Sequence, residues 1–358
     1  MSNGWRRWMW AVGGALVLGL IAYNLSRSPE WRDFQWERFW LSIRQARPGY
    51  LLASVVAVYA TYLVRAYRWK FFLDPIKQAS PWVMFVGQIL GFSSIYLIGR
   101  PGELVRPAYI AKKEDVSFTA MLAVWLLERI FDITFLVLLF SVALSTLRVG
   151  HRTVRGDLIL VQMQKGGRIL LAITLLVVVA LVAYRLYAES LRAGLLRWLR
   201  FLPPKALLAL EHFLSSFAEG LGVIRSVRSF AASLASTALL WVLNTTVFWL
   251  VFRSLGPGLD HLSWLAGALV LFCGALGLIV QIPGIGGGFQ VAMILALTEL
   301  FSVSAELATG AAVLIWVIVS APCLALGLIL LGYEGLTFKK LNAIAAEARA
   351  AGQEEARR

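Results

Sequence analysis

Three charged residues interrupt one long apolar run, and they are the side chains best suited to chemistry in this chain. Glu128, Arg129 and Asp132 stand within residues 117–147, and the four-residue spacing puts both carboxylates on one face of a helix. Counted from Ser117, Glu128 lies roughly 16 Å along that helix, near the middle of a bilayer. Each charge there costs at least ~2.5 kcal/mol, so we expect the three to pair with protein groups or to face water.

A polar patch that breaks the helical pattern upstream supplies the expected partners. It consists of Gly99, Arg100, Pro101, Gly102 and Glu103, followed shortly by Arg106. Two interpretations are open. The charges either form a buried network that holds the patch in place, or leave positive capacity on Arg100, Arg106 and Arg129 for an anionic head group. Guanidinium groups suit phosphate geometry, which favours the second.

A second patch of helix-breaking residues lies near the C-terminus and has no charge. It contains Pro283, Gly284, Gly286, Gly287 and Gly288, and Gln290 follows. Glycines let membrane helices pack closely, which is one interpretation. However, Pro and four Gly also destroy helical hydrogen bonding, which packing alone does not require. The alternative is that the freed N–H groups at the start of the next helix, together with the Gln290 amide, bind an anion.

Composition indicates a polytopic membrane protein, because 59% of the 358 residues are hydrophobic and only 15% are charged. The net charge of +14 comes from Lys and Arg that stand mostly between apolar runs, so anionic lipid explains it more simply than nucleic acid. Two cysteines and three scattered histidines predict neither a disulfide framework nor a metal site. Nucleophile-elbow, Walker and zinc-protease motifs are absent from the sequence, so we expect no catalytic residues, no cofactor and no enzyme activity.

Apolar runs define the expected topology within one transmembrane domain, residues 1–340. The first run resembles a signal peptide but lacks a small-residue cleavage site, so we interpret it as a retained helix. A stretch with leucines opposite arginines predicts an interfacial amphipathic segment at 190–229, and a polar cytoplasmic tail follows at 341–358. We expect spans at about 8–25, 49–64, 117–147, 168–187, 230–252 and 307–331, and re-entrant hairpins at about 81–111 and 262–300.

Orientation follows from the basic residues. We place residues 1–7, 65–80, 112–116 and 188–229 and the tail in the cytoplasm, so both termini lie on the cytoplasmic side of the cell (inner) membrane. This placement requires the two hairpins to enter the membrane from opposite faces. The helices near 49 and 230 also precede their hairpin arms at 81 and 262 by equal spacings. The predicted fold is an all-α integral membrane protein, a helical bundle with two opposed re-entrant hairpins in an inverted repeat.

These motifs also resemble those of a known family. Residues 99–107, then Glu128, Arg129 and Asp132, then Pro283, Gly284, Gly286 and Gly287 look like the flippase-like transmembrane family related to the membrane region of lysylphosphatidylglycerol synthases. The likeness covers about residues 45–335. It implies a helical bundle with opposed hairpins, and movement of an anionic or modified lipid between leaflets. Where the family often has Glu after the second patch, this chain has Gln290.

The expected function is therefore that of an inner-membrane flippase-like protein. It would bind and move an anionic or modified phospholipid, or a polyprenyl-phosphate-linked lipid, between leaflets. Two alternatives stay open: a non-catalytic membrane subunit that presents lipid to a separate glycosyltransferase or lipid-modifying enzyme, and an enzyme whose site lies inside the bilayer. The expected partners are phosphate-bearing membrane lipids and no nucleic acid; the sequence does not indicate the oligomeric state.

Overall fold

The computed structural model describes residues 33–74, 77–146, 154–187, 227–278, 281–282 and 286–334, with a few single positions between 194 and 211. In these ranges the regular secondary structure is helical apart from one pair of two-residue strands, so an all-α membrane fold is confirmed. In the part of the chain that the structure describes, four helices are long and apolar enough to cross a membrane, within Pro48–Leu73, Leu158–Ala180, Arg228–Ser254 and Ala305–Tyr333. The expected span 8–25, most of segment 190–229 and the tail 341–358 lie outside the described residues.

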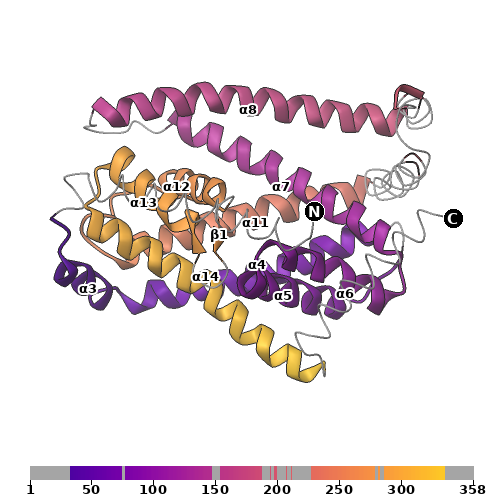
Figure 1. The fold of residues 1–358 in the computed structure, drawn as a ribbon, viewed down its shortest axis with the longest axis horizontal. Coiled ribbons are helices and arrows are strands. Elements are labelled where there is room, and N and C mark those ends of the chain that lie inside the picture. The colour runs from indigo at the N-terminus through magenta and orange to yellow at the C-terminus, as the bar shows by residue number, and fades with distance from the viewer. Residues whose placement is uncertain are drawn as a thin grey trace, which may run out of the picture. The chain divides into compact units, whose positions relative to one another are not determined.

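The helices follow the expected order along the chain (Figure 1). Most begin or end within a few residues of the bounds expected from the apolar runs. The elements are α3 (Trp36–Arg44), α4 (Pro48–Leu73), α5 (Pro81–Ile98), the 3-10 helix η1 (Arg100–Leu104), α6 (Val105–Glu114), α7 (Phe118–Thr146), α8 (Val154–Leu186), α11 (Val227–Ser254), α12 (Trp264–Gly277), β1 (Gln281–Ile282), β2 (Gly286–Gly287), α13 (Gly288–Phe301) and α14 (Ala305–Tyr333).

Helix α4 departs most from expectation, since it continues to Leu73 instead of ending near residue 64. The expected cytoplasmic loop at 65–80 therefore begins as helix. Its last turns stay helical because Trp69, Phe72 and Leu73 are fully buried, and burial of such side chains stabilises a helix well beyond intrinsic propensity. The consequence is that Arg65 and Arg68 belong to a helix packed inside the protein.

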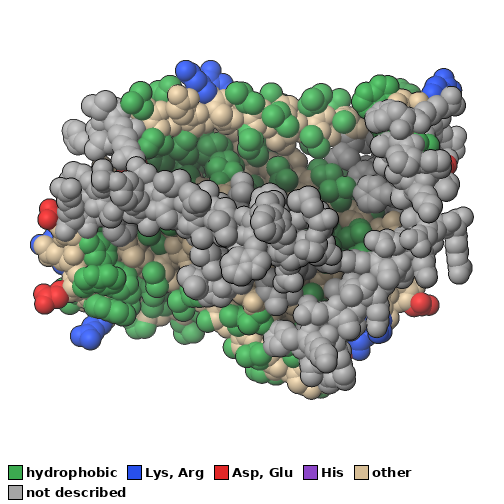
Figure 2. All heavy atoms as spheres, in the orientation of Figure 1, with side chains coloured by type: hydrophobic (Ala, Val, Ile, Leu, Met, Phe, Trp, Pro, Cys, Tyr) green, Lys and Arg blue, Asp and Glu red, His purple; other side chains and the backbone are tan. Residues whose placement is uncertain are grey.

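Helix α8 is also longer than the expected span 168–187, and it carries its apolar side chains outward. Only 11% of the most apolar stretch of α8, within Leu158–Ala180, is buried inside the protein. Leu158, Ile169 and Leu176 are all more than half exposed. Hydrophobic side chains lie along α8 at the upper edge of the space-filling view (Figure 2). An exposed apolar helix of this length is typical of a lipid-facing surface.

The chain divides into two compact units. Unit 1 holds residues 1–58, 140–166 and 244–320, and unit 2 holds residues 59–139, 167–243 and 321–358. Within unit 2, the end of α4 leads through α5, η1 and α6 into the start of α7. Within unit 1, the end of α11 leads through α12, the strand pair and α13 into the start of α14. Each unit thus contains, in the same order, the end of one long helix, a hairpin of two shorter helices with a broken tip, and the start of another long helix.

In unit 2 the hairpin is closed by glycines on its longer arm. A Cβ added to Gly91 would lie 2.6 Å from the Arg106 Cβ, and one on Gly87 would lie 2.8 Å from the Ile110 side chain. Helices α5 and α6 can therefore approach closely only because Gly87 and Gly91 lack side chains. At the tip, Gly99 adopts φ 75°, a backbone conformation that favours glycine. Gly99 and Gly102 thus turn the chain into η1, where the Gly102 N–H donates to the Gly99 carbonyl at 2.9 Å.

In unit 1, glycines on the first arm of the second hairpin likewise allow its two arms to pack closely. Side chains on Gly274 or Gly277 of α12 would collide with Phe289 and with the Gly288 backbone of α13. The tip is a short antiparallel ladder that pairs Gln281 with Gly287 and Ile282 with Gly286. Gly287 adopts φ 99°, which an L side chain rarely takes. Packing therefore accounts for part of this glycine pattern.

Candidate functional site

Six charged side chains of unit 2 converge in the interior of the protein and are called the arginine cluster below. They come from three separate elements: α4, α6 and α7. Salt bridges of 3.9 Å or less connect every member to at least one other. The members are Arg65, Arg68, Arg106, Glu128, Arg129 and Asp132.

Glu128 is the centre of the cluster, and Arg106 holds it with two parallel contacts. Arg106 Nη2 donates to Glu128 Oε2 at 2.5 Å, and Nη1 lies 3.3 Å from Oε1. The same Nη1 donates to Gln88 Oε1 at 2.6 Å. The Glu128 side chain is 0% exposed and that of Arg106 is 6% exposed. A two-pronged pair of this kind fixes orientation as well as charge, so Arg106 is part of the frame of the site.

Arg68 connects both carboxylates of α7 from the side of α4. Its Nη1 donates to Asp132 Oδ1 at 2.6 Å, and its Nη2 donates to Glu128 Oε1 at 2.5 Å. Thr237 of α11 accepts a third, longer bond of 3.3 Å from Nη1. The Arg68 side chain is fully buried. An arginine so completely enclosed must be paired to remain charged, and its contacts tie α4 and α11 to α7.

Arg65 and Arg129 are held more loosely than the other two arginines. Arg65 Nη1 lies 3.9 Å from Glu128, and Arg129 Nη2 lies 3.2 Å from Glu128 and 3.4 Å from Asp132. Their side chains keep exposures of 13% and 35%. These two guanidinium groups are therefore the members of the cluster that a ligand could reach with least disturbance.

Aromatic rings line the arginines and exclude water from one side. The Arg106 guanidinium lies 4.4 Å from the Trp69 ring centre, and the Arg65 guanidinium lies 4.9 Å from that of Phe92. Phe131, one position before Asp132, packs edge-on against Phe72. Cation–π contacts stabilise the arginines, and the low local dielectric strengthens each ion pair.

The cluster carries more positive than negative charge, because four arginines surround two carboxylates. With all six groups ionised, two positive charges remain uncompensated within the cluster. Donors are also left over: the buried Nε atoms of Arg68 and Arg129 and the Nε2 atom of Gln88 have no hydrogen-bond partner among the described residues. Excess positive charge together with unused N–H donors is the chemistry of an anion site.

The sequence predicted four of the six cluster members. Arg106, Glu128, Arg129 and Asp132 meet as expected. Glu103 lies in η1, half-buried and outside the ion pairs of the cluster, and the Arg100 side chain is outside what the structure describes. Gly99, Pro101 and Gly102 form the turn itself.

Arg65 and Arg68 were missed, because basic residues after an apolar run resemble a cytoplasmic flank. The signal that could have found them is the spacing of Arg65, Arg68, Trp69 and Phe72, which share one helix face.

The second patch lies in unit 1, and part of it is described. Gly286, Gly287 and Gly288 form β2 and the first residue of α13, whereas Pro283 and Gly284 lie outside the described residues. The Gly287 N–H donates to Gln290 Oε1 at 2.8 Å. The Gln290 side chain therefore already satisfies one of the N–H groups that the sequence offered to an anion. In the described ranges, no three His, Cys, Asp or Glu side chains form a group that could hold a metal ion.

Comparison with known protein families gives a match that covers most of the chain. Residues 10–327 match the family described as "Lysylphosphatidylglycerol synthase TM region". No curated protein matches the chain significantly. The match includes the arginine cluster and both glycine patches, and it confirms the resemblance that the motifs had suggested. It indicates a multi-pass membrane protein with a role connected to membrane lipids.

Proposed function

Because the chain belongs to the family of lysylphosphatidylglycerol synthase TM regions, we propose that it binds the phosphate of a lipid head group at the arginine cluster and moves that lipid between leaflets. The ligand is an anionic or modified phospholipid, or a polyprenyl-phosphate-linked lipid. Arg65 and Arg129 contact the phosphate. Arg68 and Arg106 hold the two carboxylates in place, and through them the shape of the site.

One observation carries this proposal: the cluster has two uncompensated positive charges while Arg129 keeps both a 35% exposed side chain and an unpartnered Nε. A buried network that served only stability would be expected to balance its charges, since each unpaired ion in a low-dielectric interior is costly. A lipid phosphate supplies the missing negative charge and accepts the unused N–H groups. Binding then neutralises the site.

The transport proposal extends to the fold. In this view, α5–α6 and α12–α13 are re-entrant hairpins that enter the inner membrane from opposite faces as an inverted repeat, with both termini cytoplasmic. Support comes from the common order of parts in the two units and from the glycines that close each hairpin. Broken elements of this kind line substrate pathways in transporters, because freed backbone groups can face a polar cavity.

A second function is a membrane subunit that presents lipid to a separate enzyme. The family description supports this function, because it names the membrane region of a synthase. Such a subunit would need the same head-group site and would differ in having a catalytic partner.

Reconstitution of the purified chain in vesicles tests the proposal. Fluorescent phosphatidylglycerol is placed in both leaflets, and dithionite bleaching of the outer leaflet reports how fast inner-leaflet lipid appears outside. With the native chain, we expect the bleached fraction of fluorescent lipid to exceed the fraction that starts in the outer leaflet. With Arg129→Gln, we expect bleaching to stop at the outer-leaflet fraction. Arg44→Gln, a change at an exposed arginine of α3, is the matched control and should behave as native.

Absence of exchange by a folded native chain would argue against transport by the chain alone. The presenting function would then be tested by co-purification of a partner enzyme, with lipid binding measured in the same preparation. Normal exchange by Arg129→Gln would instead remove the arginine cluster as the head-group site.

A further inference from the structure

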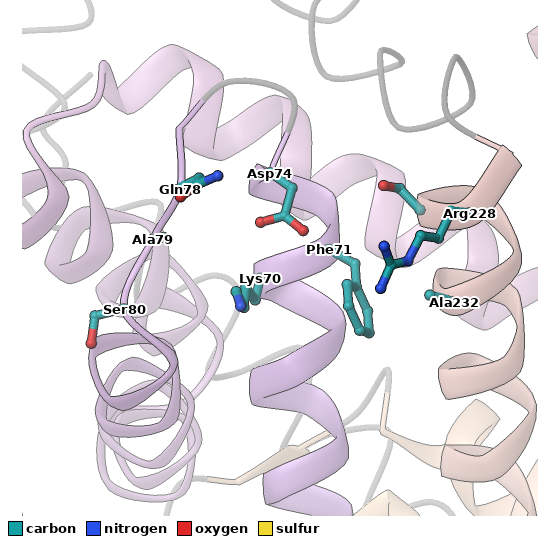
Figure 3. A pocket seen from close by; sticks show the side chains of 9 residues that line it. Lys70, Phe71, Asp74, Gln78, Ala79, Ser80, Arg228 and Ala232 are labelled. Atoms are coloured by element: carbon teal, nitrogen blue, oxygen red, sulfur yellow. The ribbon is translucent and has the colours of Figure 1, made fainter.

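A polar cavity of about 780 Å³ opens within unit 2 beside the last turn of α4. Its walls come from the end of α4, from the segment that precedes α5 and from the first turns of α11 (Figure 3). Lys70 lines it from α4, Asp74 from the position directly after the end of α4, Gln78 from the connecting segment and Arg228 from α11. None of these four belongs to the arginine cluster, so the cavity is distinct from the head-group site proposed above.

The charged groups of the cavity face a shared space. In Figure 3 the Asp74 carboxylate and the Arg228 guanidinium both point into the region in front of the Phe71 ring. None of Lys70, Asp74 and Arg228 forms an ion pair with another described side chain. All three charged groups of the cavity are thus left to interact with a ligand or with water.

The signs of these charges restrict the ligand. Lys70 and Arg228 together fit a phosphate, and Arg can bind it with two parallel hydrogen bonds. A ligand that was only an anion would leave Asp74 facing a like charge, which opposes binding. A phosphate ester that also carries an ammonium group satisfies all three, with the ammonium N–H groups donated to Asp74 and to the Gln78 amide oxygen.

We propose that this cavity binds a phosphate ester bearing a primary ammonium, the chemistry of a phosphoethanolamine head group. The phosphate lies between Lys70 and Arg228, and the ammonium lies against Asp74. Asp74 directly follows the last residue of α4 and stands six positions after Arg68, about 9 Å away at the helical rise per residue. The cavity is therefore a second head-group site, selective for a primary ammonium, one helix segment away from the anion site.

Native mass spectrometry of the full chain from nanodiscs tests the proposal. The discs hold equal amounts of phosphatidylethanolamine, phosphatidylcholine and phosphatidylglycerol with the same acyl chains. Phosphatidylcholine has the same phosphate but no ammonium N–H. We expect bound phosphatidylethanolamine to exceed phosphatidylcholine by about tenfold, the effect of one charge-assisted hydrogen bond, and Asp74→Asn to abolish that preference. Asp115→Asn, the same change at an exposed residue outside the cavity, should keep it.

Two further variants and a displacement measurement distinguish this cavity from other lipid sites. Arg228→Gln should lower binding of phosphatidylethanolamine and of phosphatidylcholine alike, whereas Arg129→Gln should leave the preference intact and so separate this site from the arginine cluster. Displacement by soluble glycerophosphoethanolamine would show that the head group suffices; lack of displacement would show that the lipid itself is the ligand. Equal binding of the two lipids to the native chain, or an unchanged preference in Asp74→Asn with a native melting temperature, would overturn the proposal.

Discussion

Arg106 and Glu128 form a buried two-pronged ion pair, with Nη2 2.5 Å from Oε2 and Nη1 3.3 Å from Oε1. The pair connects the short arm of the first hairpin to the middle of α7. Because Arg106 also donates to Gln88 of the long arm, one guanidinium holds both arms against the helix that follows them. This arrangement gives Arg106 a structural role, and the ligand contact that the sequence suggested for it stays a prediction.

Arg106→Ala should therefore destabilise the protein. Loss of the guanidinium leaves Glu128 without its closest two-pronged partner, and breaking a buried pair in this way costs about 3–5 kcal/mol. We expect a clear fall in the melting temperature in detergent, with a smaller fall for Arg106→Lys, which keeps the charge and loses the second prong. A native melting temperature combined with lost lipid binding would show instead that Arg106 contacts the ligand.

Arg129→Gln should lower lipid binding and leave stability almost unchanged. Glu128 and Asp132 keep Arg68, and Glu128 also keeps Arg106, so the carboxylates stay paired. One charge-assisted contact with phosphate is lost, worth about 1.5–3 kcal/mol or roughly ten- to hundredfold in affinity. Lipid binding measured beside the melting curve checks this, with Arg44→Gln as the control. A drop in melting temperature as large as that of Arg106→Ala would contradict it.

The two hairpins should tolerate a methyl group poorly at their glycine contacts. Gly91→Ala places a Cβ against Arg106, and Gly277→Ala places one against the Gly288 backbone; overpacking of this kind costs about 1–3 kcal/mol. Gly166→Ala is the control, since it lies in α8 with nothing within 4 Å of the added Cβ. There, alanine should stabilise the helix by roughly 0.5–1 kcal/mol. Equal melting temperatures for all three variants would show that the arms are not in tight contact.

Substitutions at Gln290 separate its capping role from a contact with lipid. Gln290→Ala removes the acceptor of the Gly287 N–H and should lower the melting temperature, by analogy with caps worth about 0.5–2 kcal/mol. Gln290→Glu keeps an acceptor and adds negative charge at a helix N-terminus, so stability should be retained or raised. If a lipid phosphate reaches this end of α13, Gln290→Glu should nevertheless weaken lipid binding. Unchanged binding would restrict Gln290 to the cap.

Cysteine labelling tests the expected orientation. In a chain whose own Cys273 and Cys323 are replaced by serine, Lys112→Cys and Pro257→Cys each introduce a thiol at an exposed position. The distribution of basic residues predicts labelling of position 112 from the cytoplasm and of position 257 from outside. Labelling of both by an impermeant reagent from the same face would contradict the inverted arrangement of the hairpins.

The sequence was most informative where local chemistry determines structure. Apolar runs located the helices, and Gly99 and Gly287 marked two turns that favour glycine. It failed where structure depends on distant partners. Arg68 has the local context of a cytoplasmic flank, and it is buried only because Glu128 and Asp132 stand opposite it, some sixty residues away along the chain. No local pattern reports such a pairing, so the cluster was incomplete when read from sequence alone.

The fixed position of the buried arginines has a consequence for what powers movement. Arg68 and Arg106 are locked into ion pairs, so under the proposed function the charge that crosses the bilayer is that of the lipid. Moving one elementary charge through the membrane potential is worth about 2.3 kcal/mol per 100 mV. An inside-negative potential would therefore bias an anionic lipid toward the outer leaflet, and the exchange would be electrogenic. A protein of this kind could work against a lipid gradient without hydrolysing a nucleotide.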